Sequence, residues 1–289
     1  MSPRLLLALP LLLALGTAVR ADPSPPRVVS LNPSLTEILV ALDALPALVG
    51  VDDYSARVRP EVRGLPRVGG LFNPSLEAIV ALEPDLVVLV PSAQQRNLRE
   101  RLEALGVDVL VLENITLDQA LASIEVLGAR VGRREAARRR VETIRTAWRE
   151  IERAAAQRQH PSAVLVLQRD PLYLVGRGSF LDQMLDAAGA HNLAAEAFDE
   201  PYPRVSLEWL IAAAPEIILD ASESVTPAVE YWERWPSLPA VRDRRVFSLP
   251  TDAVTRPGPY LDRALRTLAQ AIHDDPQPRA AAGGAESAP

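Results

Sequence analysis

Hydrophobic residues follow two alternating patterns along residues 27–273. Short continuous runs of Val, Leu and Ile, such as 27–31 and 85–90, are typical of strands that are buried on both faces. Between these runs, apolar residues recur every three or four positions, as they do on one face of an amphipathic helix. The alternation of the two patterns predicts an α/β fold with parallel sheets that helices cover on both sides.

This alternation occurs twice, before and after one long helical segment. Apolar residues form a single stripe between Arg133 and residue 159, at Val141, Ile144, Trp148 and Ile151. Because strand and helix patterns recur on both sides of it, we expect two Rossmann-like α/β lobes joined by a single long helix. Ligands commonly bind between such lobes, so we also expect an interlobe cleft. Strands are predicted at 27–31, 47–51, 85–90 and 107–112 before the long helix, and at 163–168, 172–175, within 206–219 and at 244–249 after it.

One helix–strand unit is present in both halves. Residues 75–89 read SLEAIVALEPDLVVL and residues 206–219 read SLEWLIAAAPEIIL, at a constant offset of 131 residues (206 − 75). Each copy has a glutamate, Glu77 or Glu208, near the start of its helix. The helix dipole by itself explains a carboxylate there. Its matched placement in both lobes also suits docking onto a pseudo-symmetric basic partner.

The two chain ends differ in composition from the rest. Residues 1–21, MSPRLLLALPLLLALGTAVRA, combine a basic start, a short apolar run interrupted by Pro10 and a small-residue end, which is typical of a cleaved secretory signal peptide. Residues 274–289 are rich in Pro, Gly and Ala without periodicity and are expected to be disordered. The expected division is therefore a signal peptide (1–21), an N-terminal lobe (22–132), a linking helix (133–160), a C-terminal lobe (161–273) and a tail (274–289).

The amino-acid composition limits the possible cellular compartments and binding partners of the protein. The sequence contains no cysteine, which excludes a lipidated cysteine, disulfides and thiolate sites. We therefore expect a soluble periplasmic protein that is not a lipoprotein. The net charge of −6 becomes −8 once Arg4 and Arg20 leave with the signal peptide, which argues against a nucleic-acid partner. Every one of the 31 basic residues is arginine, which a codon bias explains better than anion recognition does.

No pattern in the sequence indicates catalysis or a metal site. The histidines His160, His191 and His273 do not pair with one another or with a carboxylate at ligand spacing. The segment GRGSF at 176–180 could hold a phosphate, but a tight turn is the more typical reading of a single Gly-x-Gly. Nucleophile-elbow, Walker and zinc-protease motifs are absent from the sequence. We predict no catalytic residue, no metal and no enzymatic activity.

Aromatic residues are scarce, at 4% of the chain, so their positions are informative. Tyr54, Phe72, Tyr173 and Tyr202 fall in predicted connections of both lobes. Aromatic side chains on loops around a cleft favour a large, partly flat ligand. Trp232 and Trp235 are instead expected to pack at the end of a helix.

Five stretches between residues 27 and 273 carry a family resemblance: RVVSLNPSLTEIL, LVGVDDYS, NPSLEAIVALEPDLVV, PYPRVSLEWLIAAAPEIIL and LPTDAVTRPGPYLDRAL. Through them the chain resembles the helical-backbone class of periplasmic substrate-binding proteins, which deliver cobalamin, haem or ferric siderophores to ABC importers. Within this class it is most similar to the cobalamin-binding members. The resemblance implies capture of cobalamin in the interlobe cleft and delivery to an ABC permease dimer with its ATPase subunits. It implies no cofactor of the protein's own, a monomer, and membrane contact only through the permease.

The resemblance also assigns roles to residues. Two further tryptophans line the clefts of the cobalamin-binding members. The positions in this sequence that match them are Leu71, beside Phe72, and a position near Val90, so both tryptophans are missing here. The residues that match the cleft of these proteins are Tyr54, Tyr173, Tyr202, Asp252 and Arg256, and those that match its two permease-docking glutamates are Glu77 and Glu208.

Two alternatives to cobalamin transport stay open. The first is the same role for haem or a ferric siderophore, with Arg256, Arg177 and Arg204 as the arginines placed to face an anionic chelate. The second is a two-lobed α/β enzyme such as a glycosyltransferase, against which the export signal and the paired glutamates argue.

Overall fold

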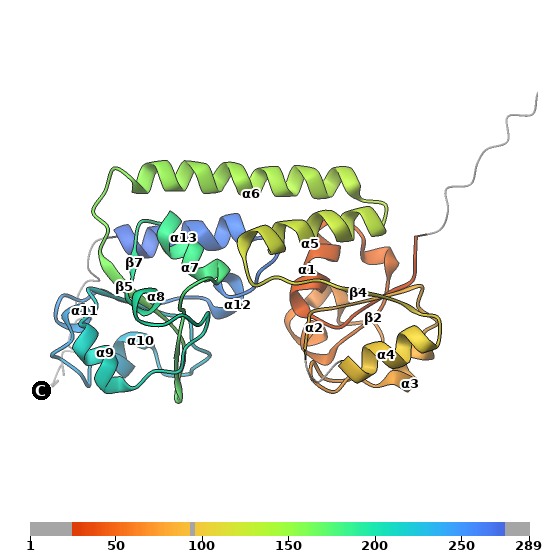
Figure 1. Cartoon of the computed structure of the whole chain (residues 1–289), viewed down its shortest axis with the longest axis horizontal. Coiled ribbons are helices and arrows are strands. Elements are labelled where there is room, and N and C mark those ends of the chain that lie inside the picture. The colour runs from red at the N-terminus through yellow and green to blue at the C-terminus, as the bar shows by residue number, and fades with distance from the viewer. Residues whose placement is uncertain (1–24, 93–95, 275–289) are drawn as a thin grey trace, which may run out of the picture.

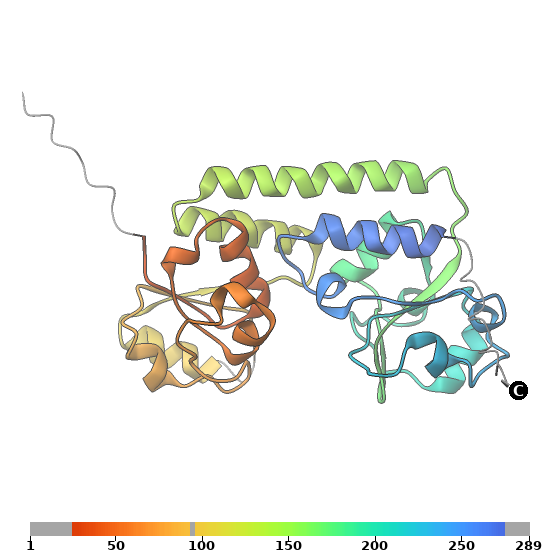
Figure 2. The same cartoon turned by 180° about the vertical axis from the view of Figure 1, so that it is seen from behind.

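The computed structural model describes residues 25–92 and 96–274, so the expected signal peptide and residues 275–289 of the expected tail lie outside the described residues. Two α/β lobes stand side by side beneath one long helix, which Figure 1 shows from one side and Figure 2 from behind. Within the described residues, no helix is long and apolar enough to span a bilayer.

The N-terminal lobe contains an all-parallel sheet in the order β2-β1-β3-β4. The strands β1 and β3 are completely buried because helices cover both faces of the sheet. The strands of this lobe are β1 (Val28–Ser30), β2 (Leu48–Val51), β3 (Leu86–Leu89) and β4 (Asp108–Val111), and its helices are α1 (Pro33–Ala41), η1 (Leu45–Ala47), α2 (Asp53–Val58), η2 (Pro60–Val62), α3 (Leu76–Val80), α4 (Arg96–Ala104) and α5 (Leu117–Arg130).

The C-terminal lobe has a sheet in the order β6-β5-β8-β9, with β7 also paired to β5. Its strand pairs are parallel except β5 and β6, which form an antiparallel hairpin, and the predicted α/β fold is confirmed. The strands are β5 (Ser162–Arg169), β6 (Leu172–Leu174), β7 (His191–Asn192), β8 (Ile217–Asp220) and β9 (Val246–Ser248), and the helices are α7 (Phe180–Ala187), α8 (Leu193–Ala197), α9 (Leu207–Ala213), α10 (Ala228–Trp232), α11 (Pro239–Arg242), α12 (Thr251–Val254) and α13 (Leu261–His273).

The long helix α6 (Arg134–Ala155) runs across both lobes, over α5 on one side and α13 on the other (Figures 1 and 2). Its 22 residues span about 33 Å. The predicted stripe is confirmed, because Val141 and Ile144 are buried and Trp148 and Ile151 pack partly buried against the same core. That core is continuous from β1 through α5 and α6 to α13, so both lobes share it.

The repeated unit is confirmed as a repeated structure. Strand β8 has the bounds of β3 shifted by 131 residues. Ser75 and Ser206 are the N-caps of α3 and α9, and their hydroxyls accept hydrogen bonds from the backbone N–H groups of Ala78 (3.2 Å) and Trp209 (3.1 Å). Both helices lie on the side of the molecule away from α6, one in each lobe (Figure 1).

The turn at 176–180 already binds a carboxylate of the chain itself. The backbone N–H of Gly178 donates to the Asp182 carboxylate at 3.0 Å, and Ser179 caps α7. A carboxylate of the chain therefore takes the place that an anion would need, and the prediction of a tight turn is confirmed. Trp232 ends α10 and is buried, and Trp235 packs beside it, as expected.

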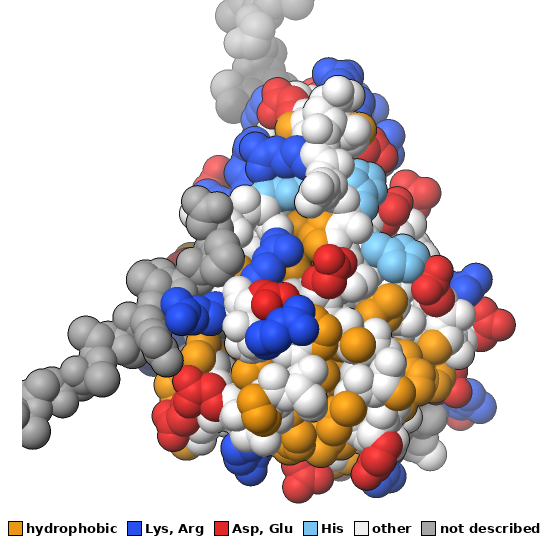
Figure 3. Space-filling model, turned by 90° about the vertical axis from the view of Figure 1, so that its left-hand side faces the viewer, with side chains coloured by type: hydrophobic (Ala, Val, Ile, Leu, Met, Phe, Trp, Pro, Cys, Tyr) orange, Lys and Arg blue, Asp and Glu red, His pale blue; other side chains and the backbone are white. Residues whose placement is uncertain are grey.

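The histidines lie at the outer end of the C-terminal lobe, in the upper part of the face that Figure 3 shows. The rings of His160 and His273 contact the backbone carbonyls of Ala155 and Ala188. His191 Nε2 lies 3.0 Å from the carboxylate of Glu196. Even so, the described residues contain no group of three or more potential metal-ligating side chains.

Candidate ligand-binding cleft

A buried polar network fixes the start of α2 and with it Tyr54. Asp52 is the N-cap of this helix, and its carboxylate accepts the backbone N–H of Ser55 at 2.9 Å. The Ser55 hydroxyl lies 3.0 Å from that of Thr36 on α1. Burial raises the pKa of Asp52, although the hydrogen bonds from Ser55 oppose this. Tyr54 thus stands in the first turn of a helix, and the prediction that it lies in a connection is wrong.

The Tyr54 hydroxyl joins the two lobes. It lies 3.2 Å from Glu223 Oε1 and 3.3 Å from Asp252 Oδ1, and both carboxylates belong to the C-terminal lobe. Burial and then the charges of Asp252 and Glu223 raise the pKa of Tyr54, so its phenol stays protonated. The hydroxyl has one proton and can donate it to only one of the two carboxylates at a time. The other carboxylate can then accept a hydrogen bond from a ligand.

Arg256 forms a second contact between the lobes. It is ion-paired with Glu37 of α1 and with Asp252, and Arg59 lies 3.5 Å from the same Glu37 carboxylate. The Glu37 side chain is only 7% exposed, and burial raises its pKa although Arg256 and Arg59 oppose the shift. The two residues that the resemblance assigns to the cleft, Asp252 and Arg256, are therefore ion-paired with each other. Arg256 is neutralised within the protein and does not present a free charge to the cleft.

Three hollows surround these contacts, and together they form what we call the interlobe cleft. The N-lobe hollow, of about 720 Å³, contains Tyr54 and Phe72. The central hollow, of about 460 Å³, contains Asp252 and Arg256. The C-lobe hollow measures about 680 Å³ and contains Glu223. Tyr54 lines the first, and its hydroxyl hydrogen-bonds to Glu223 of the C-lobe hollow and Asp252 of the central hollow.

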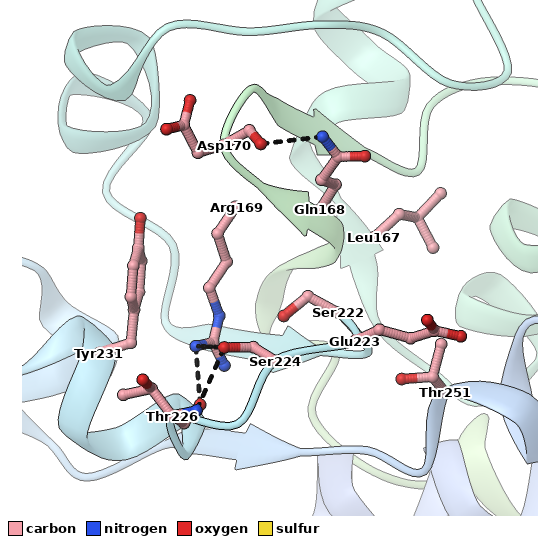
Figure 4. Close-up of a pocket in the computed structure, with 10 residues that line it drawn as sticks. All are labelled: Leu167, Gln168, Arg169, Asp170, Ser222, Glu223, Ser224, Thr226, Tyr231 and Thr251. Atoms are coloured by element: carbon pink, nitrogen blue, oxygen red, sulfur yellow. Dashed lines mark hydrogen bonds between the residues drawn. The ribbon is translucent and has the colours of Figure 1, made fainter.

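Arg169 forms a rigid wall of the C-lobe hollow. Its guanidinium donates to Asp220 at 2.9 Å and to Ser224 at 3.1 Å, and it lies 4.5 Å from the centre of the Tyr231 ring. Figure 4 shows Arg169 reaching from the β5–β6 hairpin towards Ser224 and Thr226, with Tyr231 at its side. The buried Asp220 carboxylate neutralises this arginine.

Tyr173 and Tyr202 are held close to each other by backbone pairing. Tyr173 lies on β6, which confirms the predicted strand at 172–175 and shows that the tyrosine does not fall in a connection. The loop that carries Tyr202 pairs with β6, because Leu174 N–H donates to the Pro203 carbonyl at 3.1 Å. Tyr202 is 39% exposed, and burial of its hydroxyl raises its pKa. The structure brings Tyr54 and Phe72 together in one hollow, whereas neither Tyr173 nor Tyr202 lines any of the three.

The paired glutamates have matching surroundings. Glu77 and Glu208 are fully exposed in the first turns of α3 and α9. Each carboxylate is close to its own backbone N–H and to the N-cap hydroxyl, and these contacts lower the pKa of both groups. Both side chains therefore stay ionised and point a fixed negative charge at solvent. Neither lines the interlobe cleft.

Several cleft residues are not among those predicted from the sequence. Glu37 has a local signal, since it lies on α1 beside the buried Leu35 and Ile38, where a carboxylate needs a partner. The others lie on the short helix α2, on loops or at a strand end, without a pattern that marks them: Arg57, Arg59, Arg63, Arg67, Arg169 and Glu223.

The chain is similar to binding proteins of one family. Residues 28–253 match the profile of the periplasmic binding protein family. An uncharacterized ABC transporter substrate-binding lipoprotein of Bacillus subtilis is 28% identical over 87% of this chain and 81% of its own length. The periplasmic vitamin B12-binding protein of Vibrio cholerae superposes with a TM-score of 0.76 at 25% identity, over 86% of this chain and 97% of that one. A periplasmic haem-binding protein of Pseudomonas aeruginosa superposes with a TM-score of 0.74 at 29% identity, over 89% and 95%.

Proposed function

The chain belongs to the periplasmic binding protein family, in the class that serves import of cobalamin, haem and siderophores, and from this premise we propose that it captures cobalamin in the interlobe cleft. Proteins of this family bind and deliver their ligand and are not enzymes. The ligand passes to an ABC importer. The protein acts as a free periplasmic monomer, a role that the absence of cysteine supports although the Bacillus relative is a lipoprotein.

The Tyr54 contact is the observation that carries this proposal. Tyr54 places an aromatic ring in the N-lobe hollow, and its protonated hydroxyl bonds residues that line the other two hollows. A corrinoid is a large, partly flat ring with amide groups around its edge. Tyr54 and Phe72 offer aromatic surface to the ring, and Glu223 and Asp252 accept hydrogen bonds from amide N–H groups. Tyr173 lies on the β5–β6 hairpin, which also carries Arg169 of the C-lobe hollow, and we assign it and the neighbouring Tyr202 to the proposed site.

Haem is the second candidate, and one observation favours it. The N-lobe hollow is lined by Arg57, Arg63 and Arg67, which suit the carboxylates of a porphyrin. No histidine lines the interlobe cleft and the sequence has no cysteine, so haem iron would take a tyrosine oxygen such as that of Tyr54 as its ligand. The arginines expected for a siderophore are less available, since Arg256 is neutralised and Arg177 lies 3.2 Å from Asp199.

Titration by absorbance and tryptophan fluorescence tests the ligand. We expect purified protein to bind cyanocobalamin with one-to-one stoichiometry, and Tyr54→Ala, as the matched control, to bind more weakly. Tight binding of haemin together with weak binding of cyanocobalamin would move the assignment to the second candidate. Failure of cyanocobalamin, haemin and a ferric siderophore to bind would contradict the proposal.

Glu77 and Glu208 are proposed to dock the protein onto the two halves of the permease. Their support is geometric: equivalent helices, one in each lobe, carry ionised carboxylates on the side away from α6 (Figure 1). One acidic site on each lobe suits a pseudo-symmetric permease dimer that presents basic residues.

Uptake into vesicles that carry the permease tests this docking role. Glu77→Arg with Glu208→Arg should abolish uptake and leave ligand affinity unchanged, because like charges repel where opposite charges attracted. Glu135→Arg with Glu142→Arg on α6 is the matched control, since it makes the same charge change on the opposite side. Normal uptake with the first pair of substitutions would end the docking proposal.

A further inference from the structure

The N-lobe hollow combines aromatic surface with unpaired positive charge. Its three arginines come from separate short segments: Arg57 from α2, Arg63 after η2, and Arg67 from the loop that follows. Among the described residues, none of the three forms an ion pair or a side-chain hydrogen bond with the protein. Asp53 is the one acidic residue that lines this hollow, so its lining carries a formal charge of +2.

These arginines differ from three others of the interlobe cleft, although Arg263 of the central hollow also has no ion pair among the described residues. Arg59 and Arg256 share Glu37, and Arg169 is paired with Asp220. The chain has 37 acidic residues against 31 arginines, so carboxylates are in excess overall. Other exposed arginines without an ion pair among the described residues, such as Arg134, Arg139 and Arg145, lie along α6. Arg57, Arg63 and Arg67 differ from these because they line one hollow together with Tyr54 and Phe72.

Aromatic groups arrange the hollow for a planar ligand with a charged edge. The Arg57 guanidinium lies 4.4 Å from the centre of the Tyr54 ring, a cation–π contact that holds it at the cleft. Phe72 is 67% exposed, which leaves the face of a large apolar ring open to a ligand. A planar ring could pack on Phe72 and Tyr54 while an anionic substituent reaches the arginines.

We propose that the N-lobe hollow is an anion-recognition subsite in which Arg57, Arg63 and Arg67 bind the phosphate or carboxylate substituent of the transported macrocycle. This proposal rests on the proposed function. Guanidinium groups present forked N–H donors that match the two oxygens of either anion. In a corrinoid the anion is the phosphodiester of the nucleotide loop, and in a porphyrin it is the pair of carboxylates at one edge.

Matched ligand pairs separate the two sources of the anion. Cyanocobalamin is compared with cobinamide, which lacks the nucleotide and its phosphodiester. Haemin is compared with haemin dimethyl ester, which lacks free carboxylates. We expect the protein to prefer the anion-bearing member of the pair that it binds by about tenfold or more, which corresponds to about 1.4 kcal/mol. The preference should weaken as salt is raised, since the arginines are exposed.

The triple variant Arg57→Gln/Arg63→Gln/Arg67→Gln should lose this preference. It should still bind the member of the pair that lacks the anion as tightly as the unaltered protein does. Arg134→Gln/Arg139→Gln/Arg145→Gln on α6 removes the same charge on the far side and should keep the preference. Circular dichroism of both variants checks that they fold. Binding of both members of a pair with equal affinity, or a preference that survives the N-lobe substitutions, would overturn the subsite alone. Failure of all four macrocycles to bind would overturn the proposed function and the subsite with it.

Discussion

Replacing Arg256 by glutamine removes the cation that Glu37 and Asp252 share between the lobes. Loss of one partner of a buried ion pair costs about 3–5 kcal/mol. The cost should be lower here because Arg59 still lies 3.5 Å from Glu37 and because the Asp252 side chain is 53% exposed. We expect Arg256→Gln to reduce the free energy of unfolding at pH 7 by about 2–3 kcal/mol.

The pH dependence of this loss follows from the direction of the Glu37 shift. Burial already raises the pKa of Glu37 above its ordinary value of 4.5, and loss of Arg256 raises it further. A carboxyl group with a raised folded-state pKa favours folding most below its unfolded pKa, and this contribution is lost as pH rises through the folded pKa. The penalty of Arg256→Gln should therefore be larger at pH 7 than at pH 5.

Urea unfolding of four proteins measures the coupling: the unaltered chain, Arg256→Gln, Glu37→Gln and the double variant. The double variant should recover part of the loss, because it leaves neither a buried carboxylate nor its arginine unpaired. Additive effects of the two substitutions, or an equal penalty at pH 5 and pH 7, would refute the interpretation of this pair as a buried contact between the lobes.

Two further predictions concern ligand binding. X-ray scattering curves with and without ligand should nearly overlay, because α6 and the shared core join the lobes. In addition, the Phe180 N–H of one lobe donates to the Ile115 carbonyl of the other at 2.7 Å. A large drop in radius of gyration on ligand binding would contradict this prediction. Calorimetry should show ligand binding weakened by about 1–3 kcal/mol in each of three variants: Tyr54→Ala, Tyr173→Ala and Tyr202→Ala. The matched variants Tyr173→Phe and Tyr202→Phe should keep most of the affinity because they retain the ring. Unchanged affinity in all three alanine variants would exclude them from the site.

The elements with strong local patterns could be predicted from the sequence. The buried strands, the repeated helix–strand unit and the stripe of α6 each follow from periodicity within a few turns. The capping box at Thr116 and Gln119 likewise places the start of α5, because both hydrogen bonds are made by neighbours in sequence. For these elements short-range physics decides the outcome.

The rest depends on contacts between distant residues. Helix α2 has only six residues, too few to show a helical periodicity in the sequence. Its start depends on the contact of Asp52 and Ser55 with Thr36 of α1, which explains why the sequence predicts a connection at Tyr54. The antiparallel β6 pairs with β5 through a tight hairpin, although its apolar run resembles that of a parallel strand. Glu37 and Arg256 are 219 residues apart, and only the fold brings them together.

The same limit applies to the arginines of the N-lobe hollow. A chain whose basic residues are all arginine gives no reason to single out Arg57, Arg63 or Arg67. Only their convergence on one hollow, without carboxylate partners among the described residues, distinguishes them from solvated arginines elsewhere. Phe72 and Tyr54, in contrast, were predicted as cleft residues, and the structure places both in this hollow.

The most direct test of whether the interlobe cleft is the binding site is hydrogen–deuterium exchange, measured with and without the bound macrocycle. Binding there should slow amide exchange in α2, in residues 67–74, at the tip of the β5–β6 hairpin and in residues 222–226, since these segments line the hollows. Exchange in α3 and α9, which carry Glu77 and Glu208, should stay the same. Protection confined to the outer faces of the lobes, with α2 and the hairpin unchanged, would contradict binding between the lobes.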